Sequence, residues 1–139
     1  MRERPPSSMM FLAALTILAI VTAVVAGISI YAETRSKAET QAETMTHGHV
    51  ADGRQAIIAY GCGSCHLVPG IHGANGKVGP DLTGVAQRVT LAGSLSNDPE
   101  TMVRWLEHPQ HLRPGSGMPE LGVSEANARN MAAYLYSKD

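Results

Sequence analysis

The two cysteines of the chain, Cys62 and Cys65, lie three positions apart, and His66 directly follows the second one. Three chemistries use such a pair: a redox-active dithiol, a structural zinc site and the covalent attachment of a haem. A thioredoxin-like dithiol requires a strand and a helix around the motif, and no strand pattern surrounds this one. A zinc site requires four ligands, and adjacent ligands such as Cys65 and His66 fit a tetrahedron poorly.

The third chemistry uses every reactive residue of the sequence Cys62-Gly63-Ser64-Cys65-His66. Two thiols at this spacing add to the two vinyl groups of a haem, and the histidine that follows points its imidazole at the iron. The motif therefore predicts one covalent haem c with His66 as its first axial ligand.

The second axial ligand is expected farther along the chain, where the candidates are Met102, His108, His111, Met118 and Met131. Met102 and Met131 fall on apolar faces of expected helices, which favours ordinary core packing. The two histidines flank a proline and are expected to be exposed. Met118 lies in a Gly/Pro loop where no helix requires an apolar residue, so the pattern favours Met118 as the ligand.

The elements that position these residues are predicted to be helices. From residue 50 onward no run of alternating strand residues is present, and loops rich in Gly and Pro are indicated over 70–80 and 114–119. Gly53, Ile57 and Tyr60 share one face of a first helix, directly before the haem motif. The fold class is therefore predicted to be all-α.

Two further helices have clear start signals. Asp98 is suited to be a cap and Pro99 fits the first helical position, while Pro109 ends that helix. A last helix begins at Ser124-Glu125. Its apolar stripe consists of Ala128, Met131, Ala132 and Leu135.

The N-terminal part is predicted to be a membrane anchor. Residues 9–31 carry no charge, and a helix of this length is roughly 34 Å long, which spans a bilayer with some tilt. A secretory signal peptide with a cleavage site at residues 24–26 is the competing interpretation. Because the apolar run is longer than a usual signal core, a retained single-pass helix after a short cytoplasmic segment, residues 1–8, is favoured.

Residues 32–49 are predicted to link the anchor to a domain over residues 50–139. The stretch is polar and contains Ala-Glu-Thr three times, so it either extends the membrane helix or forms a flexible tether. His47 and His49 are interpreted as solvated linker residues, because no further metal ligands lie nearby. Positive charges stand on both sides of the anchor and leave its orientation undecided: Arg2, Arg4, Arg35 and Lys37.

The amino-acid composition limits the classes of function that the chain can have. The chain has 139 residues, a formal net charge of -1 and no basic cluster, which argues against nucleic-acid binding. Only 4% of the residues are aromatic, so a domain of roughly 90 residues has few large side chains for its core. A cofactor at the centre of the domain would compensate for that shortage.

The sequence after the haem motif resembles the class I cytochromes c in several independent places. The stretch Gly79-Pro80-Asp81-Leu82-Thr83-Gly84 is similar to the family's Gly-Pro-x-Leu-x-Gly. The segment from Trp105 to Met118, WLEHPQHLRPGSGM, is similar to the one that ends in the family's distal methionine. The resemblance covers residues 50–139 and implies the class I cytochrome c fold around one covalent haem, preceded here by a single transmembrane helix.

The resemblance also implies roles for single residues. The carbonyl of Pro80 is expected to accept the N–H of the proximal imidazole. Arg88 falls where mitochondrial-type proteins place an arginine near a haem propionate, although a solvated arginine explains it as well. Trp105 either lies beside the methionine sulfur or packs in the core. The predicted cofactor-binding residues are Cys62, Cys65, His66, Pro80, Arg88, Trp105 and Met118, with His66 and Met118 bound to iron.

The chain also departs from the soluble carriers of this family. Only 16 residues separate Arg88 from Trp105, so the loop that supplies further propionate donors in mitochondrial cytochrome c is short or missing. This compact form is more similar to the cytochrome c domains of bacterial caa3-type oxidases, although the chain has no copper-centre cysteine motif. Where the soluble carriers have lysines, after Pro109, this chain has Gln110 and His111.

Charge on the predicted domain gives little support to electrostatic steering. From residue 50 on, seven Lys or Arg residues stand against eight Asp or Glu residues, so the domain does not favour an acidic partner. A membrane anchor reduces the need for steering, because it confines the search for the partner.

These features predict an electron-transfer protein rather than an enzyme. Histidine and methionine fill both axial positions of the iron, leave no site for O₂ or a small-molecule substrate, and suit a high reduction potential. The expected function is to carry single electrons to a haem–copper terminal oxidase, as a subunit of a respiratory complex. Same-class alternatives are a subunit of a quinol-oxidising complex and a donor to a photosynthetic reaction centre; a haem gas sensor or peroxidase is the alternative of a different class.

The location follows from the chemistry of haem attachment. Cytochrome c maturation joins haem to the thiols outside the cytoplasm. The haem domain is therefore expected on the periplasmic or outer side of the bacterial cytoplasmic membrane, with the N-terminus inside.

Overall fold

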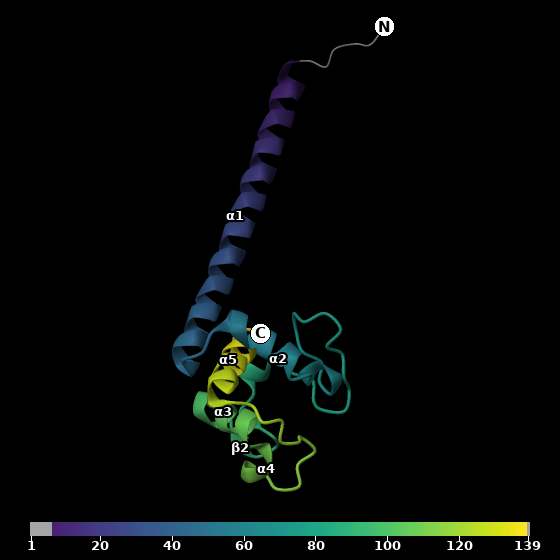
Figure 1. Cartoon of the computed structure of the whole chain (residues 1–139). Helices are drawn as coiled ribbons and strands as arrows, with labels where there is room; N and C mark the ends of the chain where they lie inside the picture. The colour runs from purple at the N-terminus through teal and green to yellow at the C-terminus, as the bar shows by residue number, and fades with distance from the viewer. Residues whose placement is uncertain (1–6, 139) are drawn as a thin grey trace. The chain divides into compact units, whose positions relative to one another are not determined.

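The computed structural model describes residues 7–138, so residues 1–6, which include Arg2 and Arg4, and Asp139 lie outside the described part. The chain divides into two compact units, residues 1–36 and 37–139. In its described part the first unit is the N-terminal portion of one helix, and the second contains every other element (Figure 1).

Helix α1 runs without interruption over Ser7–Thr46, a length of 40 residues. Its N-terminal apolar side chains, such as Phe11 and Ile20, are exposed. By length and composition α1 is the one described helix that is long and apolar enough to cross a membrane, with a mean hydropathy of 2.6 in its most apolar window. The helix continues through most of residues 32–49, where the sequence left a helix and a flexible tether open.

The last turns of α1 belong to the second unit and are packed within it. Ala42 and Thr46 are buried, with 1% and 0% of their surface exposed. The Glu43 carboxylate accepts a hydrogen bond from the backbone N–H of Val50 (2.9 Å). The C-terminal end of α1 is therefore held by the fold of the second unit.

Four further α-helices build this unit: α2 (Val50–Ala59), α3 (Pro99–Glu107), α4 (Pro109–Leu112) and α5 (Glu125–Tyr136). Two short 3₁₀ turns, η1 (Cys62–Ser64) and η2 (Val85–Gln87), follow α2. A hairpin of two-residue strands, β1 (Thr90–Leu91) and β2 (Leu95–Ser96), precedes α3. Helix α5 packs against both α2 and α3 (Figure 1). The second unit is thus predominantly helical, as the sequence predicts.

The predicted helix starts are confirmed by their capping hydrogen bonds. The Asp98 carboxylate accepts from the Thr101 N–H at the start of α3 (2.9 Å), and this bond holds the pKa of Asp98 below its usual value. The Ser124 hydroxyl accepts from the Asn127 N–H at the start of α5 (3.4 Å). The predicted apolar stripe of α5 is buried: Ala128, Met131, Ala132 and Leu135.

Two small elements were not predicted from the sequence. The strands of the hairpin are too short to produce an alternating pattern, and the turn between them uses Ala92 and Gly93 with φ angles of 46° and 87°. Pro109 ends α3 as predicted, but it also begins α4, because proline fits the first position of a helix. The break after α3 is therefore a bend between two helices.

Helices α2 and α5 approach so closely that only glycine fits at their contact. A Cβ atom on Gly53 would lie 1.9 Å from the carbonyl oxygen of Asn130 and 3.0 Å from the Cβ of Tyr134. The obstacle is mainly backbone, which cannot swing aside as a long side chain can. Gly53 therefore sets the distance between the first and last helices of the unit.

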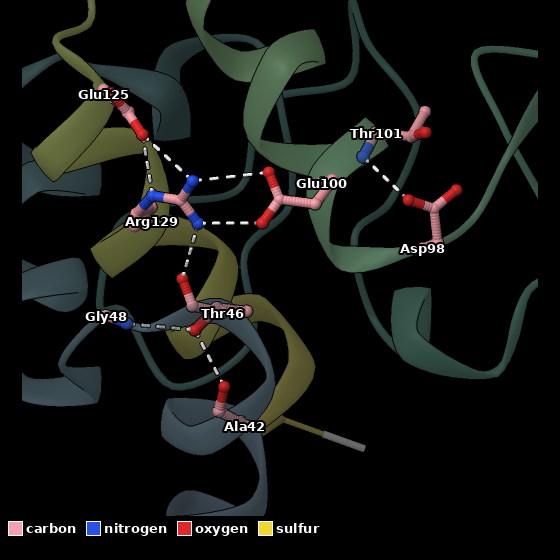
Figure 2. Close-up of polar contacts among 8 residues, drawn as sticks. All are labelled: Ala42, Thr46, Gly48, Asp98, Glu100, Thr101, Glu125 and Arg129. Atoms are coloured by element: carbon pink, nitrogen blue, oxygen red, sulfur yellow. Dashed lines mark hydrogen bonds and ion pairs between the residues drawn. The ribbon is translucent and has the colours of Figure 1, made fainter.

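Arg129 of α5 joins three helices through one guanidinium group (Figure 2). It binds Glu100 of α3 with N–O distances of 2.9 and 3.3 Å and Glu125, one turn earlier in α5, at 3.0 Å. It also donates to the carbonyl oxygen of Thr46 at the end of α1 (3.2 Å). The bonds from Arg129 hold the pKa of Glu100 below its usual value.

Replacing Gly53 by Ala is expected to destabilise the second unit. Overpacking a close contact costs about 1–3 kcal/mol, and the better helix propensity of alanine offsets about 1 kcal/mol of it. A Cβ 1.9 Å from a backbone oxygen falls at the upper end of this cost, so a net loss of about 2 kcal/mol lowers the thermal midpoint by roughly 10 °C, which circular dichroism of the full haem-loaded chain in detergent would measure. Gly27→Ala is the matched control, because a Cβ there meets nothing within 4 Å. Equal midpoints for the two variants would contradict the prediction.

Candidate haem-binding site

A cavity of about 940 Å³ lies in the second unit, at the upper end of the volumes of about 300–1,000 Å³ found for cofactor and small-molecule sites. Its walls come from α2 and the turn after it, the segment before η2, the hairpin, helices α3 and α5, and the loop after α4. Every cofactor-binding residue predicted from the sequence lines it: Cys62, Cys65, His66, Pro80, Arg88, Trp105 and Met118.

The turn that follows α2 places the cysteines and the histidine at this cavity. Gly61 directly precedes the motif and has a φ angle of 69°, in the left-handed region that favours glycine. The backbone N–H groups of Cys65 and His66 then donate to the carbonyl oxygen of Cys62, at 3.2 and 2.9 Å. This tight turn brings both thiols and the imidazole to the same cavity.

Both thiols are free and half-buried. Burial raises the pKa of the Cys62 thiol, and the neighbouring Cys65 adds to the effect. Attachment of haem adds each S–H across a vinyl group, so two free thiols at one cavity are what the reaction requires. The cysteines therefore fit the group that the motif predicts.

The imidazole of His66 is fixed by the segment that follows the motif. Its Nδ1 atom lies 2.7 Å from the carbonyl oxygen of Pro80. A carbonyl only accepts, so Nδ1 carries the proton and Nε2 keeps its lone pair, which is the form that binds a metal. The expected contact between Pro80 and the imidazole is therefore present.

A glycine next to Pro80 makes this contact possible. A Cβ on Gly79 would lie 2.3 Å from Cε1 and 2.6 Å from Nδ1 of His66. The backbone N–H of Gly79 also donates to the carbonyl of Cys65 (2.8 Å). The ring of His66 thus lies directly against the backbone that precedes its hydrogen-bond acceptor.

Met118 lines the cavity from the loop between α4 and α5 and is half-buried. Met102 and Met131, interpreted from the sequence as core residues, are buried with 2% and 1% exposed, and both line the cavity as well. His108 and His111 are exposed, and neither belongs to the cavity lining among the described residues. Of the candidates for the second ligand, Met118 is therefore the one that lines the cavity from a loop.

Two arginines supply the permanent positive charges among the described residues that line the cavity. Arg88 donates to the carbonyl oxygens of Asp81 and Thr83, the latter at 3.1 Å. Arg113 lies against Gly93 of the hairpin, where a Cβ would be 2.7 Å from its Nη1 atom. Guanidinium groups at the edge of an apolar cavity suit the carboxylates of haem propionates.

Arg113 was missed by the sequence reasoning, which looked for propionate donors only between Arg88 and Trp105. Its approach to Gly93 depends on how the loop after α4 meets the hairpin. The signal in the sequence was its position inside the segment that ends in Met118.

The rest of the lining is largely apolar and suits a macrocycle. It includes Ile57, Leu82, Val85, Leu91, Leu106 and Leu135. Trp105, which the sequence left between two roles, is half-buried and lies on the cavity side of α3. Within residues 7–138 no three His, Cys, Asp or Glu side chains gather as a metal site, and His47 and His49 are exposed. The residues present therefore fit haem better than a bare metal ion.

Comparison with known proteins adds independent information. The sequence profile of the family described as "Cytochrome c" matches residues 50–138. A "Cytochrome c oxidase subunit 2" from Alkalihalophilus pseudofirmus is 33% identical over 103 residues, which cover 73% of this chain and 28% of that protein. A protein of the same description from Bacillus sp. (strain PS3) is 31% identical over 71 residues, which cover 50% of this chain and 20% of that protein.

The match to these relatives is partial. The chain spans only about a fifth to a quarter of their length, with 20% and 28% covered. No solved structure matches the chain with significance.

Replacing Gly79 by Ala is expected to disturb the proximal side of the haem. The added methyl overlaps the His66 ring, so the imidazole must tilt, and the bond predicted from this histidine to the haem iron would weaken. We expect a high-spin fraction in the ferric state, measured by electron paramagnetic resonance of the full chain. Lys77→Ala, an exposed change in the same loop, should remain low-spin. A fully low-spin Gly79→Ala protein would show that the ring is not confined in this way.

Proposed function

The chain belongs to the cytochrome c family, and on that premise we propose that it is a membrane-anchored monohaem cytochrome that passes single electrons to a haem–copper terminal oxidase. The observation that carries this proposal is the single cavity shared by Cys62, Cys65, His66 and Met118. Haem supplies the redox chemistry when bound: its iron takes up and releases one electron. The residues of the chain hold the group, orient its ligands and exclude water.

The proposed ligands assign electron transfer rather than catalysis. His66 and Met118 would hold the haem iron from its two sides, which would leave neither O₂ nor a substrate a free position on the metal. Methionine ligation raises the reduction potential, which suits the oxidising end of a respiratory chain. Pro80 and Gly79 hold the histidine from behind, and the apolar walls lower the dielectric constant around the metal.

The assignment to an oxidase is supported by the relatives. Both are described as subunit 2 of cytochrome c oxidase, and the first match includes nearly three quarters of this chain, 73%. In our proposal the haem domain is associated with such an oxidase as one subunit of a respiratory complex.

The membrane anchor and the charge of the domain support an electron donor that stays in the membrane together with its partner. Helix α1 is long and apolar enough to span a membrane, and residues 50–139 carry nearly balanced charges. Confinement in a membrane raises the effective concentration of a partner without electrostatic steering. Because haem is attached outside the cytoplasm, we place residues 32–139 on the periplasmic or outer side.

Met118→Ala tests the ligation. Loss of the thioether should lower the reduction potential by roughly 0.2 V, a part of the about 0.8 V range that axial ligands span, and should open the ferrous iron to CO. Redox titration and a CO difference spectrum measure the two effects. Met102→Leu removes another thioether that lines the cavity and should change neither. An unchanged potential in Met118→Ala would rule Met118 out as the ligand. Ready CO binding by the unmodified protein at neutral pH would argue for a sensor or peroxidase.

The partner is tested by isolating the tagged full chain from membranes in mild detergent. Oxidase subunits recovered in stoichiometric amounts at high salt are expected, together with cyanide-sensitive reoxidation of the reduced haem by that preparation. Recovery of the chain alone, with an intact spectrum, would make it a free membrane-bound shuttle. Recovery with a quinol-oxidising complex or a reaction centre would contradict the assignment to an oxidase.

A further inference from the structure

The loop that carries Met118 has little regular structure of its own. It follows α4 and leads to α5. Among the described residues, the backbone–backbone hydrogen bond inside residues 113–120 runs from the Ser116 N–H to the Arg113 carbonyl (3.1 Å). Gly115 has a φ angle of 79°, and a Cβ on Gly117 would meet nothing within 4 Å. The backbone of this loop therefore does not by itself fix Met118.

The side chain of Gln110, in α4, supplies the missing hydrogen bonds. Its Nε2 atom donates to the carbonyl oxygens of Met118 (2.6 Å) and Ser116 (2.8 Å) and lies 2.9 Å from the Ser116 hydroxyl. Its Oε1 atom accepts from the backbone N–H of Gly115 (3.0 Å). One amide group thus binds the backbone of the loop at Gly115, at Ser116 and at Met118.

The chemistry of these partners determines which way the amide points. The two carbonyl groups can only accept, and the N–H of Gly115 can only donate. The reversed amide would place Oε1 against two oxygens and the NH₂ group against an N–H. Nε2 carries two hydrogens, one for each carbonyl, so the amide of Gln110 matches this conformation of the loop.

Gln110 is itself held in place. Its backbone N–H donates to the Glu120 carboxylate (2.8 Å), which lies beyond Met118 in the sequence. Pro109, which precedes it, is among the fully buried side chains of the unit. Gln110 is therefore bound by the part of the loop that precedes Met118 and by the residue that follows beyond it. These bonds fix the position of its amide group.

Gln110 acts on the site from outside the cavity. Ser116 and Met118 belong to the described lining of the cavity, whereas Gln110 does not. Its bonds reach the backbone of Met118, so any effect on iron passes through the position of that residue.

We propose that Gln110 is a positioning residue for Met118, holding its backbone so that the thioether stays directed at the haem cavity. The inference rests on the proposed function, because it requires Met118 to be the axial ligand. Without the amide, the loop gains other conformations in which the thioether leaves the iron, and an external ligand competes more successfully for the open position.

The test is a titration of the ferric full-length protein with imidazole, followed by the loss of the sulfur-to-iron charge-transfer band. Gln110→Glu places a carboxylate against the carbonyl oxygens of Ser116 and Met118, and Gln110→Leu removes the hydrogen bonds without adding charge. Both should bind imidazole about tenfold more tightly, since leaving the part-buried carbonyl oxygens of Ser116 and Met118 without their donor shifts such an equilibrium by about one decade. Gln55→Glu, the same change at an exposed position of α2, should leave the affinity unchanged.

Wild-type imidazole affinity in both Gln110 variants would overturn the inference, even if their thermal midpoints fell, because a merely structural role lowers stability without releasing the thioether. Met118→Ala, measured in parallel, distinguishes a failure of the positioning role from a failure of the proposed ligation. If it binds imidazole tightly and the Gln110 variants do not, only the positioning role fails. If it also keeps wild-type affinity, Met118 is not the ligand and the proposed ligation fails. Should the charged variant not accumulate, Gln110→Leu carries the test.

Discussion

The close contact between α2 and α5 is the constraint on which the rest of the haem domain depends. Gly53 allows the two helices to meet backbone against backbone at Asn130, and the haem motif begins only a few residues after α2 ends. The position of the cysteines is therefore set by the packing of α2. Arg129, on the same helix α5, binds Glu100 of α3 and the carbonyl at the end of α1. Helix α5 thus fixes the positions of α2, which precedes the thiols, of α3 and of the last turns of α1 relative to one another.

The cavity explains why a domain with so few aromatic residues can be stable. Its apolar walls come from every helix of the second unit except the short α4 and the end of α1. Met102 and Met131 are buried and border the cavity at the same time, so they pack against whatever fills it. A covalent macrocycle in this space removes apolar surface from water that the side chains alone leave exposed. Cofactor and core are therefore one structural feature, and the proposed ligands of iron are positioned by the same packing that stabilises the fold.

Much of the site could be predicted from the sequence, because its chemistry is encoded in short stretches. The haem motif depends on a spacing of three residues, and the helix starts depend on capping residues that act within one turn. Met118 could be singled out because it stands in a Gly/Pro loop, where no helix requires an apolar residue. The contacts of Arg113 and Gln110 could not be predicted, since both depend on where a loop without regular structure comes to lie. The end of α1 was ambiguous for another reason: its buried residues are small, such as Ala42 and Thr46, and leave no apolar pattern.

The two sides of the proposed iron site are held in different ways, and this difference has a consequence for electron transfer. On the His66 side a backbone carbonyl and a glycine confine the ring directly. On the Met118 side the confinement comes from the Gln110 amide, which belongs to another element and binds the loop from behind. A one-electron carrier changes the charge of its metal while its ligands stay in place, so ligands that are fixed before the electron arrives require little rearrangement. The histidine side has this property from its local sequence, whereas the methionine side acquires it only when α4 and its loop have folded together.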